Sequence, residues 1–270
     1  MRTGWLKSVS KYSWIGYTAA RSEWAYSAAN VSRIIFMATV LYVFMRLWSV
    51  VYEGAGVERL GGLTEKQMLW YLVATESIIM SMPRLWYEVD HEVRTGAVAV
   101  QLIRPLSYIG AHFGRSTGER LVRFAINLVM GSLIATLFAG PIAFSLSGLA
   151  MFAMVLPMAF IIDFFGAMLV GLCAFWLEST QGIALIYSRL MMLLGGLMVP
   201  LEVYPDSVQP ILRALPFAAI LNAPGRMLVA PTFALFVQCL GLQALCLVVY
   251  GFGVFALHRY ALRRVFVNGG

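Results

Sequence analysis

Charged side chains are scarce in this sequence. Asp, Glu, Lys and Arg make up 12% of the 270 residues, whereas the hydrophobic residue types make up 60%. A typical soluble domain has about 25% charged residues, so this chain has too little polar surface to coat a water-soluble body. The composition excludes an ordinary soluble protein and an intrinsically disordered chain, and it predicts a protein embedded in lipid.

Cysteine and histidine are also rare, with three residues of each type. Cys173, Cys239 and Cys246 all lie inside apolar runs, which indicates small core residues and excludes a disulfide scaffold. His91 has no other histidine or cysteine near it in the sequence, so we expect no metal site. We expect no catalytic residue, cofactor or metal in this chain. The basic residues are scattered between apolar segments, which argues against a nucleic-acid partner.

Several apolar stretches are long enough to cross a hydrocarbon core of about 30 Å as helices. They are apolar on all sides, which excludes the alternating pattern of transmembrane strands. The sequence therefore predicts an all-α integral membrane protein, a single transmembrane domain over residues 1–270. Its six predicted transmembrane helices are Ser32–Tyr52, Gln67–Trp86, Arg123–Gly140, Leu146–Leu177, Gly182–Val199 and Phe233–His258.

The distribution of Lys and Arg predicts the orientation. These residues gather in the N-terminal segment, in the connection between the second and third predicted spans, and in the C-terminal tail. An even number of spans puts all three regions on one side, which the positive-inside rule makes the cytoplasm. We expect a multi-pass protein of the plasma membrane with both termini cytoplasmic. Residues 1–30 have no uninterrupted apolar region, so no cleavable signal peptide is apparent.

Two segments on the cytoplasmic side are not simple spans. Residues 1–30 alternate aromatic and charged residues, which favours an interfacial amphipathic helix over a frayed basic terminus. Residues 87–107 form the longest cytoplasmic connection, with a short helix expected from Ala97 to Ile103 because Pro105 disfavours helix in the residue before it. We expect this connection to press into a partner protein, although a solvated loop is the alternative. Its candidate coupling residues are Glu88, Asp90, Glu92, Arg94 and Arg104.

The connection between the fifth and sixth predicted spans has an unusual density of proline. Residues 200–231 hold six of the ten prolines, yet the segment is too apolar for a free loop. Such a segment fits two short helices that re-enter the outer leaflet, where protein or a water-lined cavity can satisfy the interrupted backbone. We expect this hairpin to act as the outer lid, with Pro200, Phe217, Ile220 and Leu221 as its candidate residues.

Arg46, Glu76, Asp163 and Arg189 fall inside predicted spans. Each such charge costs about 2.5–3.5 kcal/mol at the membrane centre on insertion scales, so each needs a partner or water. Depth along the helices predicts the pairs Arg46 with Glu76 and Asp163 with Arg189. Structural ion pairs are the favoured interpretation, and the lining of a polar substrate path is the alternative.

The order of these segments resembles the permease subunit of a type-2 ATP-binding-cassette exporter. Its more specific motifs are Arg94-Thr95-Gly96 with Arg104-Pro105-Leu106-Ser107, and Gly195 to Leu201 with Leu215-Pro216-Phe217. The resemblance implies half of a translocation pathway, completed by a second permease subunit that is identical or related. It also implies a location in a bacterial inner membrane, an outward transport direction, and self-association through the second and fifth spans.

ATP hydrolysis is expected on another polypeptide. A P-loop needs Gly-Lys followed by Ser or Thr, whereas Lys7, Lys11 and Lys66 follow Leu, Ser and Glu. We therefore expect ATP-Mg on a cytoplasmic ATPase partner and not on this chain. Two other functions stay open: a membrane-embedded enzyme acting on lipid through Asp90-His91-Glu92, and a non-transporting scaffold that binds an ATPase.

Overall fold

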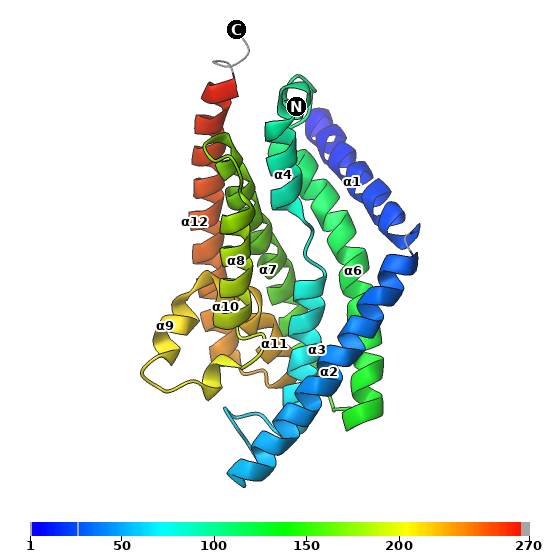
Figure 1. The fold of residues 1–270 in the computed structure, drawn as a ribbon, viewed down its shortest axis with the longest axis vertical. Helices are drawn as coiled ribbons and strands as arrows, with labels where there is room; N and C mark the ends of the chain where they lie inside the picture. Colours follow the sequence, from blue (N-terminus) through cyan, green and yellow to red (C-terminus); the bar gives the residue numbers. More distant parts are fainter. Residues whose placement is uncertain (1, 26, 266–270) are drawn as a thin grey trace.

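The protein is a bundle of long helices, seen here in a computed structural model that describes residues 2–25 and 27–265 (Figure 1). In this part of the chain all the regular elements are helical, as the composition predicts. In chain order the α-helices are α1 (Arg2–Ala25), α2 (Ser27–Ala55), α3 (Glu65–Met80), α4 (Leu85–Arg94), α5 (Ala97–Leu102), α6 (Tyr108–Ala139), α7 (Leu146–Leu172), α8 (Gln181–Leu194), α9 (Gln209–Ala214), α10 (Pro216–Ile220), α11 (Asn222–Val229) and α12 (Phe233–Val265). Two short 3-10 helices, η1 (Cys173–Phe175) and η2 (Leu201–Val203), complete the list.

Four of the described helical segments are long and apolar enough to cross a membrane: Val31–Ala55, Tyr108–Ala139, Leu146–Phe175 and Phe233–Arg263. They contain the first and sixth predicted spans, and all but the last one or two residues of the third and fourth. The second predicted span is divided, because α3 ends at Met80 and α4 starts at Leu85 beyond Pro83. The fifth is shortened, because α8 ends before Gly195 and Gly196, and Gly196 has the positive φ of 81° that favours glycine. Length alone thus supports four crossings.

Hydrogen bonds to capping side chains define where α3, α6 and α7 begin. Thr64 and Gln67 form a reciprocal capping box at the start of α3. The Ser107 and Ser145 hydroxyls accept hydrogen bonds from the backbone N–H groups of Gly110 and Gly148 and start α6 and α7. The Ser107 cap extends α6 well beyond the predicted start at Arg123, so the polar stretch from residue 108 onward is helix and not loop.

Helix α1 runs alongside α6, and the two backbones approach closely (Figure 1). A Cβ added at Gly118 would lie 2.0 Å from the carbonyl oxygen of Gly16, and one added at Gly114 would lie 2.6 Å from that of Tyr12. Only glycine fits this contact, which we call the glycine seam. The predicted helix in residues 1–30 is thus present as α1 over Arg2–Ala25, whereas the side chains of Trp5, Lys7 and Tyr26 lie outside those that the structure describes.

Helix α3 is the centre of the core. Every residue from Met68 to Ile78 is buried, against α2, α6 and α11. Because the chain itself covers α3, this helix cannot supply a face for self-association, and that part of the prediction is wrong. Helix α8 has the opposite character, with Ile183, Leu185, Ile186 and Leu193 all exposed.

The start of α1, the end of α12 and the α4–α5 segment lie at one end of the bundle, which we call the terminal end (Figure 1). Helices α9 to α11 lie toward the opposite end. Residues 200–231 fold into η2, α9, α10 and α11, where two short helices were predicted. The prolines divide the segment as expected, with Pro210 and Pro216 in the first turns of α9 and α10. Helix α11 packs against α7 and α3, so this segment is part of the core.

Candidate functional site

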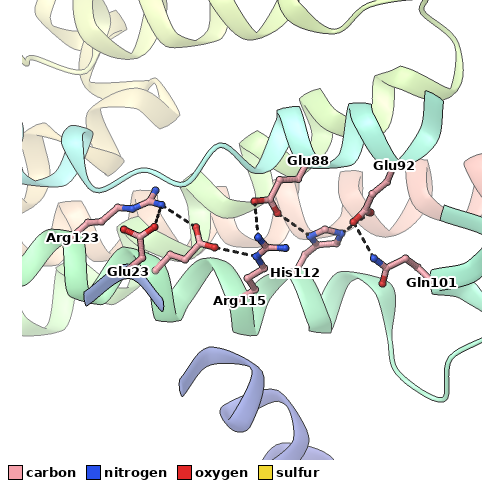
Figure 2. A network of polar contacts seen from close by, with 8 residues as sticks. Glu23, Glu88, Glu92, Gln101, His112, Arg115 and Arg123 are labelled. Atoms are coloured by element: carbon pink, nitrogen blue, oxygen red, sulfur yellow. Dashed lines mark hydrogen bonds and ion pairs between the residues drawn. The ribbon is translucent and has the colours of Figure 1, made fainter. Parts of the chain in front are cut away.

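At the terminal end, a network of polar and charged side chains links α1, α4, α5 and α6 (Figure 2). Arg123 contacts both Glu23 and Glu119, and the Nε of Arg115 donates to Glu119 at 3.0 Å. These contacts join α1 to α6 through opposite charges. The apolar stretch of α6 begins only after Arg123, so the network marks the polar end of that helix.

The same network continues onto α4. The Nη2 of Arg115 lies 3.5 Å from Glu88, and the Nε2 of His112 lies 3.1 Å from Glu92. Glu92 also accepts hydrogen bonds from the Tyr108 hydroxyl at 2.8 Å and from the Gln101 amide at 3.0 Å. Glu92 therefore holds α4, α5 and α6 together (Figure 2).

These surroundings shift the pKa values of the carboxyl groups. The hydrogen bond from Arg123 lowers the pKa of Glu23 below its ordinary value, in spite of partial burial. Burial raises the pKa of Glu92, but the hydrogen bonds from His112 and Tyr108 and the charges of His112 and Arg115 together outweigh it, so the net shift is downward. Burial raises the pKa of Glu88 more than the nearby Arg115 lowers it.

Asp90 connects α4 to the start of α8. Its Oδ1 accepts hydrogen bonds from the backbone N–H of Thr180 at 3.0 Å and from the Thr180 hydroxyl at 2.8 Å. Thr180 is fully buried, and the other carboxylate oxygen of Asp90 lies 2.8 Å from Arg94. No pattern in the sequence signalled this contact, because 90 residues separate its partners.

The turn beyond these contacts is exposed. Helix α5 covers Ala97–Leu102, close to the prediction of Ala97 to Ile103, and ends before Arg104-Pro105. Ile103 is 82% exposed and Val100 is 55% exposed, with Arg94 and Arg104 also exposed. We call Arg94–Pro105 the tip. Of the five candidate coupling residues, Arg94 and Arg104 lie on the tip, whereas Glu88, Asp90 and Glu92 point inward and brace it.

The predicted pairs of intramembrane charges are both wrong. Arg46 is exposed and its guanidinium lies 5.7 Å from the Tyr42 ring, while Glu76 is buried with no ion pair to any described residue. Arg189 is exposed on α8, and its Nη1 lies 3.7 Å from the Met192 sulfur. The predicted pairs used only the position of each charge along its helix, which does not give the direction in which its side chain points.

Asp163 instead pairs with Arg120, which precedes the third predicted span and is therefore expected in the cytoplasmic connection. Arg120 Nη1 lies 2.7 Å from Asp163 Oδ2, and both side chains are about 95% buried. The Tyr187 hydroxyl lies 3.4 Å from the other oxygen of Asp163. The pair joins α6 to α7 beside a cavity of about 300 Å³ that opens between the two helices.

The segment proposed as a lid is held by polar side chains at the opposite end. The Tyr71 hydroxyl donates to Gly196 O at 2.6 Å, and Gln243 Nε2 donates to Val155 O and Ala219 O. The bonds to Gly196 O and Ala219 O satisfy carbonyl groups near the ends of α8 and α10, and the bond to Val155 O connects α12 to α7. Of the candidate lid residues, Pro200, Ile220 and Leu221 are buried and Phe217 is half-buried.

The described residues contain no group of three or more His, Cys, Asp or Glu side chains that could hold a metal. Asp90, His91 and Glu92, the candidate enzyme site, point to different partners. Asp90 bonds to Thr180, His91 stacks on Tyr87, and Glu92 bonds to α5 and α6. They form no common catalytic cluster.

Comparison with known proteins identifies the family. The family described as "ABC-2 family transporter protein" matches residues 36–265, which include α3 to α12 and most of α2. A comparison with curated proteins finds no match. The matched family is a membrane component of transporters and is not itself catalytic, in agreement with the all-helical fold and its apolar spans. Because the match extends over most of its length, the chain belongs to the ABC-2 family of transporter proteins, as a membrane-spanning permease.

Proposed function

We propose that this chain is the permease subunit of an ATP-binding-cassette exporter, driven by a separate cytoplasmic ATPase that binds ATP-Mg. The observation that carries the proposal is the tip, which exposes Val100, Ile103 and two arginines and is held from behind by Glu92 and Asp90. An ATPase can transmit a conformational change only through a rigid element, and hydrogen bonds connect this tip to α6 and α8. Family membership itself implies an ATP-binding-cassette partner.

In this proposal α3 and α8 complete six membrane crossings, with both termini and the tip in the cytoplasm of a bacterial cell. The chain continues from the end of α3 at Met80 past Pro83 into α4, and from the end of α8 into the buried Gly195-Gly196 turn. The basic residues at the terminal end support this orientation. A second permease subunit, identical or related, completes the pathway and covers the exposed apolar side of α8.

The outer hairpin, residues 200–231, is proposed as the lid of the pathway. Ile220 and Leu221 have no exposed surface, which fits a closed resting state. Outward release then requires that α10 and α11 move away from α7 and break the hydrogen bond between Gln243 and Ala219. Lipid surrounds the exposed apolar faces of the bundle.

The test uses the complex with its ATPase in inside-out vesicles, with the native cysteines replaced by alanine. Single cysteines at Phe217, Ile220 and Leu221 report whether the lid opens to a thiol reagent enclosed in the vesicle lumen. We expect slow labelling without nucleotide and much faster labelling with ATP-Mg. Ile211→Cys is the matched control, since Ile211 is 65% exposed and should label rapidly in both conditions.

Two results contradict the proposal. Rapid labelling at all three positions regardless of nucleotide would mean an exposed loop with no lid. Slow labelling that ATP-Mg leaves unchanged, in a complex that hydrolyses ATP, would favour a non-transporting scaffold over an exporter.

A further inference from the structure

Helix α12 carries a stripe of exposed side chains at the terminal end of the bundle. Phe252, Phe255 and Ala256 are followed by Arg259 and Arg263 at steps of three or four residues, so all five lie on one side of the helix. Together with Tyr260 they line a surface hollow of about 320 Å³. The hollow is apolar toward the middle of the helix and basic toward its end.

The two arginines of the hollow have no acidic partner. Arg259 and Arg263 are exposed, and neither forms an ion pair with any described residue. In contrast, Arg115 and Arg123 at the same end of the bundle both contact carboxylates. The end of α12 therefore presents two positive charges that no described side chain neutralises.

The position of these arginines along α12 matches the level of lipid headgroups. A hydrocarbon core of about 30 Å takes about 20 helical residues. Counted from Phe233, where α12 begins, it ends near Phe252. Arg259 lies seven residues, or about 10 Å, further along the helix, and its long side chain can reach back toward the membrane. Phe252 is thus at the level of acyl chains and Arg259 at the level of phosphate groups.

The chemistry of the hollow fits a ligand with an anionic group and a hydrocarbon chain. Residues four apart on a helix are neighbours, so the guanidinium groups of Arg259 and Arg263 can both donate to the oxygens of one phosphate. The ring of Tyr260 is stacked on that of Trp176, with 5.4 Å between the ring centres, and forms one wall. The exposed Phe252 ring offers apolar surface directly beside this phosphate position.

We propose that Arg259 and Arg263 bind the phosphate of one anionic diacyl phospholipid from the leaflet at the terminal end, with an acyl chain along Phe252 and Phe255. A zwitterionic lipid fits less well, because its own cationic group cancels the charge of its phosphate. The site requires only that α12 crosses the membrane. It does not depend on the transport direction or on the ATPase partner.

The experiment uses the full chain in phosphatidylcholine nanodiscs with trace amounts of a photoactivatable lipid. One probe is a phosphatidylglycerol and the other a phosphatidylcholine, with the same diazirine on the acyl chain, so that the two differ only in the headgroup. Each arginine at an anionic surface favours binding roughly fivefold. We therefore expect phosphatidylglycerol to label Phe252 and Phe255 about tenfold more than phosphatidylcholine does. Val129 and Leu133, exposed on α6, are the internal reference that both probes should label equally.

Two results with the unmodified protein would overturn the proposal. Equal labelling of Phe252 and Phe255 by the two probes would mean ordinary contact with bulk lipid. Labelling of these residues by neither probe would mean that a second copy of the chain covers this face of α12.

Two double variants identify the charges responsible. Arg259→Gln with Arg263→Gln should reduce the preference for phosphatidylglycerol at the two phenylalanines to less than about twofold. Arg94→Gln with Arg104→Gln is the matched control, because it removes the same net charge from the tip and leaves α12 unchanged, so the preference should remain. All four arginines are exposed, so both variants should fold. A preference that survives the α12 change, or one that both changes abolish, would overturn the assignment to Arg259 and Arg263.

Discussion

Replacing Asp90 with alanine should loosen the tip from the rest of the bundle. The change removes two hydrogen bonds to a fully buried Thr180 and one ion pair to Arg94. A hydrogen bond to a charged acceptor contributes about 1.5–3 kcal/mol to the free energy of unfolding, so the loss of these two bonds accounts for most of the expected destabilisation. The ion pair adds under about 1 kcal/mol, because the Arg94 side chain is 45% exposed.

We therefore expect Asp90→Ala to lower the free energy of unfolding by about 3–5 kcal/mol. Asp90→Asn keeps an oxygen that can accept both bonds from Thr180 and should cost only about 1–2 kcal/mol. Arg94→Ala is the control for the ion pair and should cost less than about 1 kcal/mol.

The assay is the thermal unfolding of the purified protein in detergent, together with limited proteolysis between α4 and α6. A loss of about 3 kcal/mol corresponds to a drop of roughly 6–12 °C in Tm for a chain of this size. Proteolysis should become faster in the same order as Tm falls. If Asp90→Ala unfolds within about 2 °C of the unmodified protein, or if Arg94→Ala costs more than Asp90→Ala, then Asp90 does not brace the tip through Thr180.

Two further changes test the contacts behind the tip. Gly118→Ala should strongly lower the Tm, because the added Cβ would lie 2.0 Å from the Gly16 carbonyl oxygen. Gly241→Ala is the control, since a Cβ there has open space and should leave the Tm unchanged or slightly raised. Equal Tm values for the two variants would contradict the glycine seam. Acid should also weaken the ion pairs and hydrogen bonds of Glu23 and Glu92, because the pKa values of both carboxyl groups are lowered in the folded protein. Their contribution to stability is complete above about pH 4.5 and is lost as the pH falls through the pKa of the folded state. The difference in Tm between the unmodified protein and Glu92→Gln should therefore shrink from pH 7 to pH 3.5, and a constant difference would show that Glu92 does not act through its charge.

Local sequence signals predicted much of the fold. The helix over Ala97–Leu102 followed from Pro105, and the start of α7 at Leu146 followed from the apolar run that Ser145 caps. The prolines of residues 200–231 predicted two short helices, and the segment contains three short α-helices and one 3-10 helix. In each case the information lies within a few residues of the element it determines.

The contacts of the candidate site could not be predicted in the same way. The polar residues around Arg120 predict that it lies in a solvated loop. In the structure it is part of α6, where Glu119 and Arg123 lie on the side of α1 and Arg120 points toward α7. The ion-pair partner of Asp163 is on α6, whereas the prediction placed it on α8. Pairing of buried charges depends on how the helices rotate about their axes, and tertiary packing determines that rotation.

The most direct test of the proposed coupling is a crosslink between the tip and the ATPase. A complex with Ile103→Cys in a cysteine-free background is treated with a short thiol-to-amine crosslinker. Ile211→Cys serves as the control, since it is a similarly exposed isoleucine in the proposed outer hairpin. The account predicts a covalent permease–ATPase product at position 103 and none at position 211. A stable, active complex in which position 103 forms no product with the ATPase would contradict the claim that this tip receives the motor.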